Sequence, residues 1–431
     1  MLIQMYKMTI KEKFKNSIRR GTGEAHLIMR ANPKIDFSNY IIKAALNNFS
    51  YDNQSEGSRA VYIFELIELS NRKEKIREAV LRRLANERTD SWALDQLFGI
   101  TALLAKNGDL QARKAIYKRF YKKRIKYSEW LGEDAIIAVD GIEGLKFIAE
   151  IKGKMIQRYP EERDDGFIVD FFQDNNPDIN VYDELEKSAI NRTYIKTYLN
   201  TILKYKNLRP GGKRQKYNYE IVSERINSNV MIPLPPADVK DLSESDIKKL
   251  ASDFLNETDR LRQEKYMRIF DRIQYPYDYQ SILEIAKGKY SNKDRLIEFS
   301  IKALRFFKSK DIRDFALEKI SRAKYLDIYI NLLIGNYKNG DSKLLHEIVQ
   351  RTKNEHKIDD LAFSYVGIYT ANKTKDCKVP LAALYDKLTC GIHRKDIVNI
   401  LIENKVLPTK IMREIEHDSY EATRVLWLEN N

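Results

Sequence analysis

The sequence predicts an all-α protein built as a right-handed solenoid of antiparallel helical hairpins, in one or two arms. Three observations predict this fold class. Glycine and proline are scarce, with 17 and 10 residues in a chain of 431, whereas β-proteins need a turn about every eight to twelve residues. Apolar residues recur at helical spacing along most of the chain. Short polar turns separate pairs of such segments, and a hairpin of this kind buries its apolar face only against neighbouring hairpins.

The first hairpins are predicted in the N-terminal quarter of the chain. Residues 57–70 and 72–85 each carry one apolar face, and a short polar turn joins them. A second pair, 91–105 and 110–123, is separated by a turn that ends in Asp109. Aspartate accepts hydrogen bonds from the first free amides of a helix, so Asp109 is expected to be an N-cap.

Two more hairpins are predicted in the C-terminal half. Asp311 and Asp341 are expected to be the N-caps of their second helices, and the interval between them suits one hairpin. The four helices are expected at 294–307, 312–323, 325–337 and 342–352.

Two segments interrupt the helical pattern. Residues 205–216 contain Pro-Gly-Gly and predict a flexible basic loop. Residues 229–238 contain three prolines and therefore cannot form a helix. The sequence thus predicts an N-terminal helical region at 1–228, a Pro-rich linker or loop at 229–240, and a C-terminal helical region at 241–431.

The turns into the second helices resemble one another. Asp109 is followed by Arg113, and Asp311 by Arg313. In these turns, about half of the chain resembles proteins of the HEAT and armadillo helical-repeat superfamily. The resemblance implies a solenoid that presents a groove to peptides or proteins. An irregular all-α globule is the alternative.

Composition disfavours several other classes of protein. No apolar run reaches the roughly 18 residues that span a bilayer, and the N-terminus is too polar for a secretory signal. The two cysteines, Cys377 and Cys390, fit reduced and partly buried thiols better than a disulfide framework or a zinc signature. We therefore expect a cytoplasmic protein with no membrane association and no cofactor.

Basic residues are concentrated in the first half of the chain. The net charge is +14, and residues 1–216 hold 40 basic against 29 acidic residues. Segments 113–126 and 204–216 are basic and contain no acidic residue. Such segments can follow a phosphate backbone by displacing counterions, although a solvated helix face and a loop would show the same pattern. The candidate nucleic-acid-binding residues are Lys114, Lys118, Arg119, Lys122, Lys123, Lys126, Arg209, Lys213, Arg214 and Lys216.

Residues 161–186 are acidic, with ten Asp and Glu residues and one arginine. Asp170 and Asp174 lie four residues apart, but Pro177 breaks the periodicity and no glycine-bearing calcium loop is present. We expect no metal here. The segment suits an acidic surface that meets a basic partner or the protein's own basic loop.

The motif survey identifies no enzyme class. Trp92 and Asp95 are similar to the tryptophan and aspartate that HEAT-like alkylpurine DNA glycosylases carry on one repeat helix, although they lie three residues apart here and four apart in that family. A core tryptophan beside a solvated aspartate is the alternative. Glu24 is a third pocket candidate, next to glycines that lack the spacing of a phosphate-binding loop.

Together these patterns predict a scaffold that binds a protein or peptide partner. A nucleic-acid-binding protein, with a DNA-repair glycosylase as one form of it, is the alternative. A hydrolase or transferase whose site is assembled from distant residues is a third hypothesis.

Overall fold

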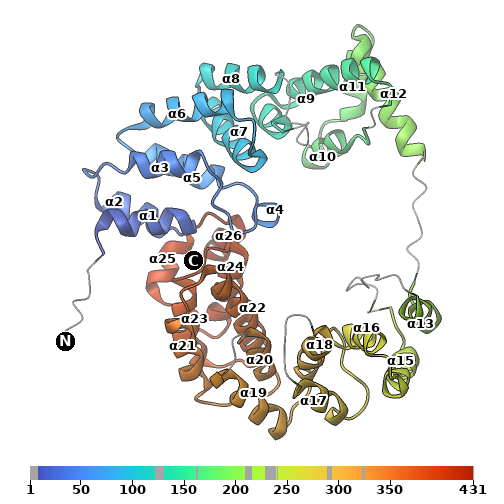
Figure 1. Ribbon diagram of the computed structural model, residues 1–431. Helices are drawn as coiled ribbons and strands as arrows, with labels where there is room; N and C mark the ends of the chain where they lie inside the picture. The colour runs from blue at the N-terminus through green and yellow to red at the C-terminus, as the bar shows by residue number, and fades with distance from the viewer. Residues whose placement is uncertain are drawn as a thin grey trace. The chain divides into compact units, whose positions relative to one another are not determined.

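The structure is a computed structural model that describes most of the chain (Figure 1). The described residues are 8–121, 131–161, 164–208, 216–228, 239, 241–288, 294–322 and 326–430. All regular structure in these residues is helical and none is β-strand, which confirms the all-α prediction. The chain divides into two compact units. Unit 1 contains Met1–Gly212, Thr389–Gly391 and Met412–Asn431, and unit 2 contains the rest.

Unit 1 consists of the N-terminal helices and one helix from the C-terminal end of the chain. Its helices are α1 (Ile10–Arg20), α2 (Glu24–Ala31), α3 (Ser38–Ala45), α4 (Asn53–Glu56), α5 (Ala60–Leu69), α6 (Lys73–Asn86), α7 (Ser91–Lys106), α8 (Leu110–Tyr121), α9 (Glu133–Arg158), α10 (Phe167–Asn175), α11 (Val181–Ala189), α12 (Thr193–Leu208) and α26 (Glu421–Glu429).

The helices from α3 to α9 pack in two series. In one series α3 packs on α6 and α6 on α8, and in the other α5 packs on α7 and α7 on α9. Within the hairpins, α3 contacts α5, α6 contacts α7, and α8 contacts both α7 and α9. The four helices predicted between residues 57 and 121 are therefore present as α5 to α8, with ends shifted by a few residues.

Helix α9 bends at Gly141, whose backbone angles (φ 55°, ψ −129°) lie outside the helical range and favour glycine. Helix α9 packs with α7, α8 and α12, and the residues after the bend belong to both apolar clusters, since Ile148 lies in the cluster of α7 and α8 and Leu145 in that of α12. The approach to α12 requires a second glycine. A Cβ atom at Gly153 would lie 1.7 Å from the Tyr194 carbonyl oxygen. The apolar core of unit 1 thus consists of two clusters that meet along α9.

Arginine–aspartate ion pairs connect one hairpin to the next. In each pair an arginine contacts an aspartate roughly one hairpin further along the chain, and Arg313 holds its partner by two hydrogen bonds of 2.8 Å. The pairs are Arg77–Asp109, Arg113–Asp140, Arg260–Asp294 and Arg313–Asp341. Two of the residues on which the resemblance rests thus form ion pairs with a neighbouring hairpin. Arg113 contacts Asp140, and Asp109 contacts Arg77.

Side chains also donate hydrogen bonds to the last carbonyl groups of several helices. These groups have no partner within their own helix. Lys387 Nζ, for example, lies 2.6 Å from the Val349 carbonyl oxygen and 2.9 Å from that of Thr352. The donors are Gln96 at the end of α3, Arg119 at α6, Lys265 at α13 and Lys387 at α21. The positive charge of the arginine and the two lysines among these donors also suits the negative end of the helix dipole.

Unit 2 contains the remaining helices, and α25 begins in unit 2 and ends in unit 1. These helices are α13 (Tyr219–Asn227), α15 (Glu244–Asn256), α16 (Arg260–Phe270), α17 (Gln280–Ala286), α18 (Arg295–Leu304), α19 (Lys310–Arg322), α20 (Asp327–Ile330), α21 (Asp341–Arg351), α22 (Glu355–Ala371), α23 (Lys378–Tyr385), α24 (Gly391–Glu403) and α25 (Thr409–Ile415), with 3₁₀ turns η1 (Asn331–Leu333) and η2 (Lys375–Cys377). Contacts run between alternate helices, such as α16 with α18, α18 with α20 and α20 with α22.

The helix predicted at 325–337 is not continuous. It consists of α20, η1 and a turn. The Asn336 side chain explains the interruption, because its Nδ2 donates to the carbonyl oxygens of Leu332 (3.0 Å) and Phe307 (2.9 Å) and so fills a site that a continued helix would use.

The N-cap predictions also differ in outcome. Asp109 Oδ1 accepts hydrogen bonds from the amides of Gln111 (2.9 Å) and Ala112 (3.0 Å), which confirms it as a cap. Asp311 and Asp341 instead lie in the first turns of α19 and α21. The segment 205–216 is partly helical, since α12 extends to Leu208, and most of the predicted linker 229–240 lies outside the described residues.

The C-terminal segment of unit 1 is held against α2 and α5 by a polar cluster. Arg424 of α26 donates two hydrogen bonds to Glu65 of α5, at 2.6 and 3.0 Å. His26 Nε2 of α2 lies 3.1 Å from Glu65, and its ring stacks on that of His417 with centroids 5.0 Å apart. Arg30 Nη1 lies 2.9 Å from His417 Nε2, a contact that requires a neutral imidazole as acceptor.

The charge states in this cluster follow from burial and from the neighbouring groups. Burial lowers the pKa of His26. Burial, together with the repulsion that a protonated His26 would exert, lowers the pKa of His417 to about 4. Burial alone would raise the pKa of Glu65, but hydrogen bonds from His26 and Arg424 hold it at about 2. At neutral pH the cluster therefore combines two neutral histidines with an ionised Glu65–Arg424 pair.

Candidate functional site: a pocket between α5, α7 and α9

A pocket of about 290 Å³ opens in unit 1 between three helices of the same series, α5, α7 and α9. Its lining is mostly small or apolar, and its ionisable side chains are Asp95, Lys106 and Asp134. The lining residues are Ser58, Ala60, Val61, Asp95, Phe98, Gly99, Ala102, Leu103, Lys106, Gly132, Asp134, Ala135 and Ala138. Along α7 they recur every three or four residues, so one face of this helix forms the floor.

Small residues create the space, and two glycines fix the distance between the walls. A Cβ atom at Gly99 would lie 2.7 Å from Ala60 Cβ, so α5 and α7 approach closely at this point. Gly132, with a φ of +101°, begins α9, and a Cβ atom there would lie 2.6 Å from the Phe98 ring. Residues from three separate segments of the chain thus form one cavity.

The two carboxylates of the pocket have no partner among the residues that the structure describes. Within the part of the chain that the structure describes, no hydrogen bond or ion pair reaches Asp95 or Asp134. Burial raises the pKa of Asp95, and the negative charge of Asp134 raises it further. Burial also raises the pKa of Asp134, which is the more exposed of the two. No positive charge of the described residues offsets these two shifts.

The three pocket candidates from the sequence have different surroundings. Asp95 lines the pocket. Trp92, one turn earlier on α7, is 42% exposed and is not part of the lining. Glu24 lies at the start of α2, where Ser17 Oγ donates a hydrogen bond of 2.5 Å to it. Sequence reasoning missed Asp134, whose only signal was its place in the first turn of a helix that follows a glycine.

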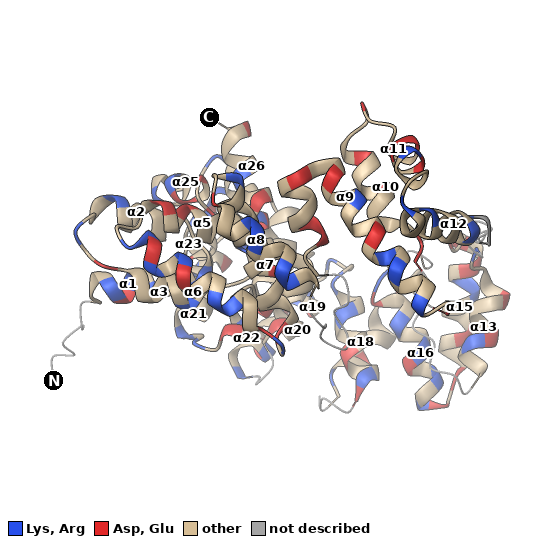
Figure 2. Ribbon diagram, turned by 90° about the horizontal axis from the view of Figure 1, so that it is seen from above, with Lys and Arg blue, Asp and Glu red and all other residues tan. Residues whose placement is uncertain are grey.

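The basic candidates divide into exposed, buried and undescribed residues. Lys114 and Lys118 are exposed on α8, which shows several basic positions in Figure 2. Lys216 is also exposed. Arg119 is buried on the opposite side of α8, where its Nη2 donates to the Glu87 carbonyl oxygen at 2.8 Å. The remaining candidates, Lys122, Lys123, Lys126, Arg209, Lys213 and Arg214, lie outside the described residues.

The acidic segment 161–186 contacts basic groups of unit 1 itself. Asp170 of α10 accepts a hydrogen bond of 2.5 Å from Lys206 of α12. Asp164 accepts one of 2.7 Å from Lys152, which is buried and also lies 3.0 Å from Glu133. Burial raises the pKa of Glu133 to about 7, although the neighbouring Lys152 opposes this effect. These carboxylates therefore serve to connect α9, α10 and α12.

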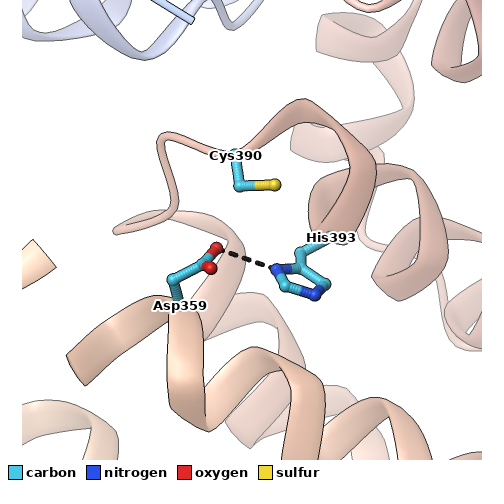
Figure 3. Close-up of side chains that lie close together, drawn as sticks. All are labelled: Asp359, Cys390 and His393. Atoms are coloured by element: carbon cyan, nitrogen blue, oxygen red, sulfur yellow. Dashed lines mark hydrogen bonds and ion pairs between the residues drawn. The ribbon is translucent and has the colours of Figure 1, made fainter. Parts of the chain in front are cut away.

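Unit 2 contains a close acid–histidine contact. His393 Nδ1 of α24 lies 2.8 Å from Asp359 Oδ1 of α22 (Figure 3). These two side chains offer fewer ligands than zinc usually takes from protein, so we assign no metal to the pair. Cys390, also labelled in Figure 3, belongs to unit 1, where its buried side chain forms no disulfide. Cys377 of unit 2 is likewise buried and unbridged, as the sequence predicted.

No protein-family model, curated protein or solved structure matches this chain. None of the helices among the described residues combines the length and the apolar character that crossing a membrane requires.

Proposed function

We propose that the chain is a helical-repeat protein of the HEAT or armadillo kind that binds a protein or peptide partner along the face formed by α5, α7 and α9. The pocket of about 290 Å³ on this face is the observation that carries the proposal. Ligand pockets are typically apolar with a few polar groups, which is the composition seen here.

The packing of the helices supports the repeat architecture. Successive hairpins contact one another in two series, and arginine–aspartate pairs recur from hairpin to hairpin in both units. A right-handed solenoid, with one run of hairpins in each unit, accounts for both features. Solenoids of this kind present long surfaces on which partners bind.

A selection of phage-displayed random peptides on the full chain tests this function. Enriched peptides should bind the wild-type protein and lose at least about tenfold in affinity for Ala102→Leu, which fills the pocket floor. The matched control is Ala371→Leu, at an exposed position at the end of α22 in unit 2. If no peptide is enriched, or if the enriched peptides bind Ala102→Leu as well as the wild type, this face is not the binding surface.

Nucleic-acid binding is the second candidate, because Lys114 and Lys118 are exposed on one side of α8. Fluorescence anisotropy with single- and double-stranded DNA and RNA at two salt concentrations tests it. Affinity should fall steeply with salt, and replacing both lysines with glutamate should reduce the salt dependence. Tight binding would justify a glycosylase assay, since Asp95 lines a pocket as the resemblance implies. Unchanged binding after the double replacement would leave α8 as a solvated face.

A further inference from the structure

We propose that the pocket between α5, α7 and α9 binds the cationic end of a lysine or arginine side chain from the partner, with the charged group between Asp95 and Asp134 and the aliphatic stem against the apolar walls. This inference rests on the binding function proposed above and names the chemistry that the partner presents.

The shape and composition of the pocket fit this occupant. Lysine and arginine combine a flexible apolar stem with a charged end, so they are best received by a cavity that is apolar along its walls and acidic at one position. The walls are alanine, valine, leucine and phenylalanine side chains, and both carboxylates belong to the lining. Lys106 lies three turns from Asp95 on α7, so the only basic group of the lining stands away from the acidic position on this helix.

The electrostatics favour the same occupant. Ionised carboxylates beside apolar walls are costly unless a cation or a donor compensates them, and in the described part of the chain no side chain does so. Burial raises the pKa of both groups. A bound cation would stabilise their ionised forms, which lowers both pKa values and contributes to the free energy of binding. Asp134 also lies in the first turn of α9, where the helix dipole favours its ionised form.

Other occupants fit less well. A phosphate or carboxylate would meet two like charges at the acidic position. A purely apolar side chain would bury the carboxylates further and leave them without a partner, which costs free energy. The net charge of +14 makes general attraction of a cation to the protein unfavourable, so a preference for cations would report this local site.

Methyl NMR spectroscopy of the full 431-residue chain tests the inference with defined probes. The alanine, leucine and valine methyl groups of the lining, such as those of Ala102 and Ala135, report occupancy directly. The probes are n-butylammonium, n-butylguanidinium, n-butanol and butyrate, which share one stem and differ in charge. The cationic probes should shift the pocket resonances at concentrations about five- to tenfold lower than n-butanol, as one charge-assisted contact implies.

Variants locate the preference. Asp95→Asn with Asp134→Asn should remove the advantage of the cations over n-butanol while the neutral probe still binds. Asp174→Asn, at an exposed carboxylate of α10, is the matched control and should keep the advantage.

Each result has one meaning. Equal binding of cations and n-butanol, or tighter binding of butyrate, overturns the inference and leaves the peptide-binding function standing. Absence of any shift in the pocket resonances shows that the cavity does not admit a side chain, which also overturns it. If the peptide selection enriches no peptide, by contrast, the proposed peptide-binding function is overturned, regardless of how the four probes bind.

Discussion

Acid should loosen the contact between the C-terminal segment of unit 1 and its N-terminal helices, because this contact contains two histidines that the fold holds neutral. His417 accepts a hydrogen bond from Arg30 and stacks on His26. Protonation would place a positive charge against Arg30 and, through His26, near Arg424. Glu65 and Glu416 are the acidic groups that face the histidines, and Glu65 is already paired with Arg424.

The magnitude follows from the difference in pKa between the folded and unfolded states. A histidine whose pKa is lowered by folding binds protons more readily in the unfolded chain, so stability is lost as the pH falls below 6.5. With a folded pKa of about 4, His417 alone lowers the free energy of unfolding by about 2 kcal/mol between about pH 7.5 and about pH 5. The lowered pKa of His26 acts in the same direction. Glu65, with a folded pKa of about 2, contributes stability that is lost only below 4.5.

Hydrogen exchange measured by mass spectrometry on peptides from α2 and α26 provides the assay. After correction for the intrinsic rate, protection of α26 should fall by a factor of about 30 over this pH interval. His417→Gln should remove much of this pH dependence. His356→Gln, at an exposed histidine of unit 2, should retain it. Protection that does not change with pH in the wild type, or that changes equally in His417→Gln, would refute the reasoning.

Three other substitutions test the electrostatic assignments. Lys152→Met should destabilise unit 1 by about 3 kcal/mol in urea unfolding, because it removes the cation paired with the buried Glu133 and the half-buried Asp164, whereas the exposed Lys154→Met should have little effect. Lys387→Met should increase hydrogen exchange at the end of α21, with a loss of about 1–3 kcal/mol, and the exposed Lys378→Met serves as its control. Asp95→Asn should stabilise unit 1 slightly near pH 7 but not near pH 3, because a raised pKa means that ionisation of Asp95 opposes folding. A difference in stability between variant and wild type that is the same at both pH values would contradict this.

The helices themselves were predictable because their signals are local. Asp109 caps α8 as expected, and Ile116 and Phe120, four residues apart on α8, are both buried. Arg119, one of the basic candidates, is buried. It lies three residues after Ile116 and next to Phe120, so it belongs to the buried face, and its charge is used at the C-terminus of α6.

The pocket and the polar cluster were not predictable from one sequence. The pocket depends on the close approach of Gly99 to Ala60 and of Gly132 to Phe98. The spacing of residues in the sequence predicts neither of these contacts. The contact of Arg30 with His417 joins positions 387 residues apart. Helical periodicity reports which face of a helix is buried, but it does not report which distant helix covers that face.

The structure also separates the polar residues that the fold uses from those that it does not. Asp109, Arg119 and Asp170 were notable in the sequence for their charge, and each has a partner within its own unit that explains its presence. Asp95 and Asp134 have none in the described residues, and burial in the apolar pocket raises the pKa of the half-buried Asp95, whereas Asp134 is exposed. The proposed lysine or arginine side chain of a partner would supply the positive charge that the described residues do not place at Asp95 and Asp134.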